Sequence, residues 1–123
     1  MANAVLVNTE LDLIKSNFLE RLKDELTTLE VGDDNTTPLE SDTSIGNLVD
    51  STTFDDIDEA ISDQITFNAK FGITAFVGDT IRETTLKNGS GIKTHSLSVE
   101  ALKGADQIFW VSTTVKITAI NKT

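Results

Sequence analysis

Alternation of apolar and polar residues in the second half of the chain constrains the fold more than any other feature. Ile65, Phe67 and Phe71 alternate with polar neighbours such as Thr66 and Asn68. This period of two is typical of a β-strand with one buried face. The runs with this extended character are residues 65–71, 80–87, 92–102 and 109–119.

The connections between these runs are short and rich in turn residues. Residues 88–91 read Asn-Gly-Ser-Gly, which favours a tight hairpin because Gly and Asn tolerate positive φ. Residues 103–106 form a second turn. Parallel strands need crossover connections of about a dozen residues or more, so these links predict antiparallel pairing.

The N-terminal part predicts one amphipathic helix. Its apolar residues recur three and four positions apart, and Asn8 or Thr9 is expected to cap its first turn. They are Leu11, Ile14, Phe18, Leu22 and Leu26, with Leu19 beside them. The sequence leaves open whether this stripe packs on the chain's own sheet or against another subunit.

These patterns together predict an α+β fold, with the helix followed by an antiparallel β-sandwich-like domain. We divide the chain into an N-terminal helical segment, residues 1–30, and a β domain, residues 31–123, with an acidic loop at 31–63. A short strand is expected at residues 27–31, and turns and loop from 32 to 47. Residues 50–62 fit a helix or a strand, and we favour a strand.

The net charge of −10 is concentrated in residues 31–63. This segment has ten acidic residues and no Lys or Arg, whereas residues 64–123 carry seven basic and four acidic residues. Clustered cations, which nucleic acid binding requires, are missing from the acidic segment, so we expect no nucleic acid partner. The segment is either a solvated loop or a surface for a basic partner.

Composition and the N-terminal residues narrow the function classes further. The chain has no cysteine, which excludes disulfides, thiolate metal sites and cysteine nucleophiles. The first residues lack a basic region, and their apolar run is too short for a signal peptide or a membrane span. We therefore expect synthesis in a cytoplasm and no membrane insertion.

A series of segments resembles tail fibre and tail-appendage proteins of tailed phages. The series begins with the Gly-Asp-Asp-Asn-Thr-Thr-Pro turn at 32–38 and the Ser-Asp-Thr run at 41–43, followed by Leu48 and Val49. It continues with an alternating strand, the Ile-Arg-Glu motif at 81–83, a Gly-containing turn and a closing strand of alternating Thr and apolar residues. Their order and spacing carry the resemblance, over roughly residues 27–120.

The resemblance implies a non-enzymatic structural protein of the virion, built in the host cytoplasm as part of a tail, baseplate or tail fibre. Homo-oligomers and other virion proteins are the expected partners. Two alternatives remain: a receptor-binding adhesin that stacks Trp110 on a host surface glycan, and a capsid decoration or head-tail connector protein.

Candidate interface residues follow from the helix stripe and from the Ile-Arg-Glu motif. Adjacent strand residues face opposite sides, so Arg82 and Glu83 are expected to pair across strands or with a neighbouring subunit rather than with each other. The predicted interface set is Leu11, Ile14, Phe18, Leu22, Arg82 and Glu83.

Chemical sites have weak support. His95, the one histidine, lacks a neighbouring nucleophile motif, so we predict a structural role and no catalytic residue. The acidic segment offers many oxygen ligands, and Asp33, Asp34 and Asp42 are the candidate Ca²⁺ ligands. The EF-hand spacing is absent, so calcium stays an alternative and no cofactor is assigned.

Overall fold

The computed structural model describes residue 4, residues 6–61 and residues 63–116. In this part of the chain one helix precedes seven strands, which confirms the predicted α+β class. The elements are α1 (Asn8–Glu25), β1 (Thr28–Gly32), β2 (Leu48–Thr53), β3 (Asp56–Asp58), β4 (Gln64–Phe71), β5 (Thr80–Asn88), β6 (Gly91–Leu102) and β7 (Phe109–Lys116).

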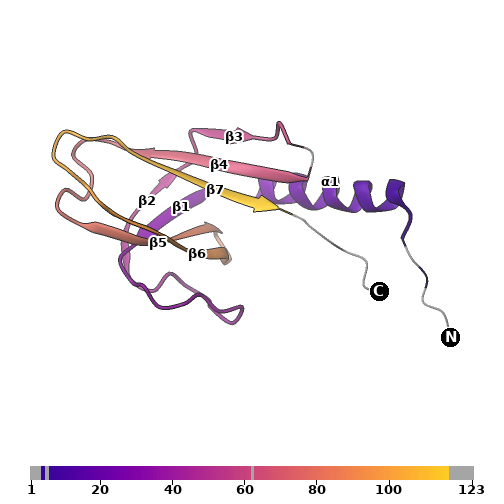
Figure 1. The fold of residues 1–123 in the computed structure, drawn as a ribbon, viewed down its shortest axis with the longest axis horizontal. Helices are drawn as coiled ribbons and strands as arrows, with labels where there is room; N and C mark the ends of the chain where they lie inside the picture. Colours follow the sequence, from indigo (N-terminus) through magenta and orange to yellow (C-terminus); the bar gives the residue numbers. More distant parts are fainter. Residues whose placement is uncertain (1–3, 5, 62, 117–123) are drawn as a thin grey trace.

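The strands form two antiparallel sheets that face each other (Figure 1). One sheet has the order β2-β1-β5-β6, and the other has the order β3-β4-β7. The predicted hairpin joins β5 to β6, with Asn88 paired to Gly91. The helix α1 projects beyond the strands at one end of this sandwich (Figure 1).

The core lies between the sheets and follows the predicted alternation. In β4, Ile65, Phe67, Ala69 and Phe71 are buried, while Lys70 is exposed. The other large side chains with almost no exposed surface come from β1 and β5: Leu29, Val31, Ile81 and Leu86. The period of two thus holds in β4, whereas β1 and β5 are buried on both faces, and a register irregularity in the β5–β6 pair lies between Ile81 and Glu83.

Some sequence expectations need correction. The expected strand across residues 50–62 is two strands, β2 and β3, with Phe54 between them packing its ring 4.9 Å from Phe67. The final strand ends at Lys116, and positions 117–119 of the prediction lie outside the described residues. The acidic segment is thus loop from 33 to 47 and mostly sheet edge after that.

The helix also differs from expectation at its start. Its N-cap is Val7, which makes no side-chain cap hydrogen bond, and the Leu11 amide donates to the Val7 carbonyl at 3.0 Å. Asn8 and Thr9 already lie inside the first turn, so neither occupies the position from which a side chain caps. The helix begins without the predicted cap.

The buried side of α1 is rotated from the predicted stripe. Leu19, expected beside the stripe, is buried together with Leu22 and Leu26. Ile14 and Phe18, expected at its centre, are 41% and 37% exposed. The buried side of the helix runs through Leu11, Lys15, Leu19, Leu22 and Leu26, and Ile14 and Phe18 lie beside it. Burial decreases toward the N-terminus, where α1 projects beyond the strands (Figure 1).

Candidate functional site

The most organised polar cluster of the described residues forms where the 33–47 loop crosses β5 and β6. Its centre is Glu83, whose side chain is 1% exposed. The Glu83 carboxylate accepts backbone hydrogen bonds from Asp34 at 2.9 Å, Gly46 at 2.8 Å and Asn47 at 2.9 Å. Because these amides come from both ends of the loop, one carboxylate closes the loop at its base.

The sequence allows this closure because Gly32 has no side chain. A Cβ at Gly32 would lie 2.6 Å from the Glu83 Oε2 atom and 2.5 Å from the Asn47 carbonyl oxygen. At these distances a side chain would push the carboxylate away from the amides that it accepts. Glycine at this position therefore serves the close approach of backbone and carboxylate.

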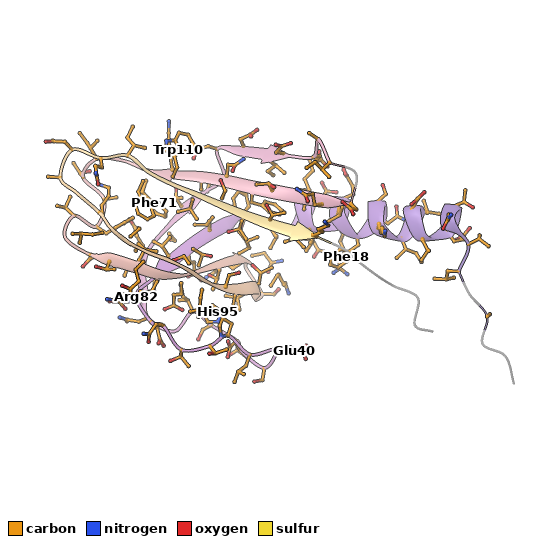
Figure 2. The ribbon with its side chains drawn as sticks, viewed as in Figure 1. Phe18, Glu40, Phe71, Arg82, His95 and Trp110 are labelled. Carbon is orange, nitrogen blue, oxygen red and sulfur yellow. The ribbon has the colours of Figure 1, made fainter. Side chains whose placement is uncertain are left out.

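His95 on β6 joins the same cluster and reaches the far part of the loop. Its Nε2 atom lies 2.8 Å from Glu83 Oε1, and its Nδ1 atom lies 2.8 Å from Asp42 Oδ2. Asp42 also accepts the Leu39 amide at 2.8 Å. We call this arrangement the Glu83–His95–Asp42 bridge, and Figure 2 shows His95 above the loop whose outer part carries Glu40.

The bridge perturbs the protonation of its members. Burial by itself would lower the pKa of His95, but the hydrogen bonds and negative charges of Asp42 and Glu83 outweigh it, and the net pKa is raised above 6.5. The pKa of Asp42 is lowered, first by the Leu39 amide and then by His95. Both directions favour an imidazolium between carboxylates.

This geometry suits a structural connection better than catalysis. Each imidazole nitrogen already faces a carboxylate, so neither is available to take a proton from a substrate. No serine or threonine hydroxyl is among the ring's described partners. The bridge holds the loop to the sheet, and an open hollow of about 330 Å³ beside it is lined by Pro38, Leu39, Glu40, Ile92 and Lys93.

The three candidate calcium ligands point to different partners. Asp33 accepts from the Asn47 side-chain amide, and Asp42 belongs to the bridge. Asp34 accepts the Thr36 amide at 2.9 Å and the Thr36 hydroxyl at 2.8 Å, which lower its pKa. Among the residues that the structure describes, no group of three or more His, Asp or Glu side chains is arranged to hold a metal ion.

Arg82 and Glu83 do not pair with each other, and both reach the start of the 33–47 loop: the Arg82 Nη1 atom donates to the Asp33 carbonyl at 3.4 Å, and Glu83 accepts the Asp34 amide at 2.9 Å. The Arg82 Nε atom pairs with Glu100 Oε1 on the adjacent strand β6 at 3.0 Å, which is the cross-strand alternative. Glu83 instead lies inside its own chain. The prediction that Glu83 is an interface residue needs correction, because a side chain with 1% exposure has almost no surface that a partner could contact.

The candidate interface residues of α1 also differ in exposure. Leu22 is buried in the chain's own core, so it too is unavailable to a partner, while Leu11 is half-buried. Val7, Ile14 and Phe18 lie seven and four residues apart, so they share one exposed face. We call these three residues the outer apolar face of α1, and the Arg21 guanidinium lies 5.5 Å from the Phe18 ring centroid.

Trp110, the glycan-stacking candidate, is 61% exposed on β7. The Lys70 ammonium lies 5.7 Å from its ring centroid, a cation–π contact (Figure 2 labels Trp110). Beside it is a small hollow of about 220 Å³ whose lining includes Ile81, Ser98 and Phe109.

Sequence reasoning assigned His95 a structural role but missed its partners. Glu83 is 12 residues away and Asp42 is 53 residues away along the chain. Neither spacing belongs to a local motif. One sequence feature could have indicated the cluster: the predicted hairpin places the strand that carries His95 beside the strand that carries Glu83.

Comparison with known proteins adds no family to this description. No protein-family model and no curated protein matches the chain. The described helix is not apolar enough over its length to cross a membrane.

Proposed function

We propose that this chain is a non-enzymatic structural protein that assembles with copies of itself through the outer apolar face of α1. One observation supports the proposal above the others: Val7, Ile14 and Phe18 are exposed at helical spacing, on a helix whose N-terminal part projects beyond the sandwich (Figure 1). A short isolated helix is marginal in water, so the projecting turns gain stability if a second surface covers them.

The size of the expected effect is moderate. Full burial of an exposed large apolar side chain contributes about 1.5 to 3 kcal/mol. Each copy offers three such residues, and Ile14 and Phe18 contribute only part of this amount because more than half of their surface is already covered. Association must also offset the loss of translational and rotational freedom, which costs several kcal/mol or more. A dimer held by one contact of this strength dissociates readily. An assembly in which each copy contacts two neighbours, as in a ring or fibre, is more stable.

The particle in which this assembly occurs is proposed from the sequence resemblance. A tail, baseplate or fibre of a tailed virus is built from many copies of small β-rich proteins with other virion proteins, and this chain has the same order of turns and strands. Under this proposal the mature location is the virion. Mass spectrometry of purified particles from the same virus tests the location directly, and absence of the chain from those particles contradicts it.

The assembly proposal is tested with the purified full-length chain by light scattering coupled to size exclusion. We expect a multiple of 13.3 kDa that increases with concentration. The double variant Ile14→Ser, Phe18→Ser should be a folded monomer. Val77→Ser is the control, because Val77 is an apolar residue at least as exposed as Ile14 and Phe18 and far from α1 in the sequence, and it should assemble like the parent.

Two outcomes would overturn the proposal. The parent chain is a monomer at every concentration, or the double variant assembles as well as the control. Running the same column with EDTA also tests the calcium alternative, because a metal-dependent assembly would dissociate.

An adhesin function is the second candidate, supported by the exposure of Trp110. Exposed indole rings stack on sugar faces, but here the Lys70 ammonium already lies over the ring and competes for it. A glycan ligand should quench the fluorescence of Trp110, which is the one tryptophan in the chain. The absence of quenching across an array of host surface glycans would contradict this function.

A further inference from the structure

We infer that the Glu83–His95–Asp42 bridge is a pH-sensitive clasp: the protonated imidazole holds the Leu39–Asp42 turn on the sheet, and the neutral imidazole releases it. The inference concerns the 33–47 loop and is independent of the assembly proposed for α1. It rests on how many protons the imidazole can share.

The number of N–H donors on the His95 ring determines whether both carboxylates can be held. Glu83 Oε1 and Asp42 Oδ2 each lie 2.8 Å from a different nitrogen of His95. A carboxylate needs a donor at that distance, and only the imidazolium carries two N–H groups. Neutral imidazole has one, so deprotonation leaves one carboxylate facing a nitrogen lone pair.

Burial decides which carboxylate loses the imidazole as a donor. Both carboxylates keep backbone donors, Gly46 for Glu83 and Leu39 for Asp42. Glu83 is 1% exposed and cannot move away from a nitrogen lone pair into solvent, whereas the Asp42 side chain is 25% exposed and can exchange the imidazole for water. The remaining proton therefore stays on Nε2 toward Glu83, and Asp42 turns to water.

Movement is confined to the middle of the 33–47 loop. Asp34, Gly46 and Asn47 remain fixed to Glu83, so both ends of the loop keep their positions. The Leu39–Asp42 turn keeps its own internal bond between the Leu39 amide and Asp42. Only the contact of this turn with β6 is lost, and the hollow that Glu40 and Lys93 line changes shape with it.

The charges around the imidazole agree with this direction. The loop presents Asp34, Glu40 and Asp42, β5 presents Glu83, and β6 itself presents Lys93. The sum around the ring is negative, which favours imidazolium. With the pKa of His95 raised, the clasp is fully closed below about pH 6.5 and opens as the pH rises through that raised value.

The acid limit follows from Asp42. Its lowered pKa means that the carboxylate stays charged down to below its ordinary value of 3.8. The clasp is therefore closed across mildly acidic conditions and opens on the alkaline side. A loop held by carboxylates alone would show the opposite trend, losing order as the pH falls.

Nuclear magnetic resonance on the full chain tests the clasp. The His95 ring signal should titrate with a midpoint above 6.5, and the amides of residues 39–43 should become mobile with the same midpoint. The amides of Gly46 and Asn47 should stay rigid. A midpoint at or below 6.5, or a turn that stays ordered through the titration, would overturn the inference.

Two variants separate the clasp from a general effect of negative charge. Asp42→Asn should leave the turn mobile at every pH and lower the His95 midpoint. Glu40→Gln is the matched control, since it removes a carboxylate of the same turn that makes no described bond to the ring. Equal shifts of the His95 titration midpoint in both variants would show that the overall negative charge of the loop, and not the hydrogen bond to Asp42, sets the protonation of His95.

Discussion

The two halves of α1 carry apolar residues at the same spacing and meet different surroundings. Leu19, Leu22 and Leu26 are buried in the sandwich core, whereas Ile14 and Phe18 keep over a third of their surface exposed. The difference has two causes: the N-terminal turns project beyond the strands (Figure 1), and Phe18, although adjacent to buried Leu19 in the chain, lies to the side of the face that meets the core. Helical periodicity shows which residues share a face, and only the neighbouring surface decides whether that face is covered.

Truncation of α1 is expected to have the largest effect, because it tests whether the C-terminal half of the helix is part of the core. Deleting residues 1–26 should abolish the fold, because it removes three buried leucines that are each worth about 2 to 5 kcal/mol, against a total stability of about 5 to 15 kcal/mol. Deleting residues 1–14 should leave the sandwich folded. Circular dichroism during thermal unfolding measures both, and a cooperative transition in the chain that begins at Thr27 would show that the inner half is not part of the core.

Single substitutions test the same difference between the two halves of α1 with a smaller loss of stability. Leu22→Ala should lower the free energy of unfolding by about 2 to 5 kcal/mol, because Leu22 is 5% exposed and its removal leaves a cavity. Leu13→Ala, at an exposed position of the outer half, should change it by less than about 0.5 kcal/mol. Urea unfolding at low protein concentration gives both values, and similar losses would contradict the division of the helix.

The smallest effect is expected at the ion pair beside the inner half. Lys23 Nζ lies 3.0 Å from Glu59, which raises the pKa of Lys23. The pair contributes below the ordinary pKa of 10.5, and its contribution is lost as the pH rises through the raised value. Lys23→Gln should therefore be slightly less stable than the parent at pH 7 and equal to it at high pH. A difference in the urea midpoint that persists at high pH would contradict an ion pair.

Much of the sandwich was predictable because a strand with one buried face repeats every two residues. The expected strands at 65–71, 80–87 and 92–102 appear as β4, β5 and β6, since the turns between them are marked by Gly and Asn. The segment from 50 to 62 was less clear. Its acidic residues suit an edge, and Ile57 fits a helical face as well as a strand face, so periodicity alone could not decide.

The polar site was much less predictable. The sequence indicates Asp42 as a candidate calcium ligand and Glu83 as a candidate interface residue, but no motif along the chain connects either residue to His95. Their meeting depends on the pairing of β5 with β6, which sets Glu83 opposite Leu97, and on the path of the loop over that pair. Contacts between distant residues of this kind leave no spacing to read.

By itself the sequence determined the α+β class, the antiparallel strands with their buried faces, and the concentration of negative charge in residues 31–63. These are local properties, set by side-chain period, turn residues and composition. The tertiary structure alone decided how far along α1 the core extends, and that His95 lies between Asp42 and Glu83. Both outcomes depend on which surfaces meet, because burial and hydrogen bonding are properties of neighbours in space.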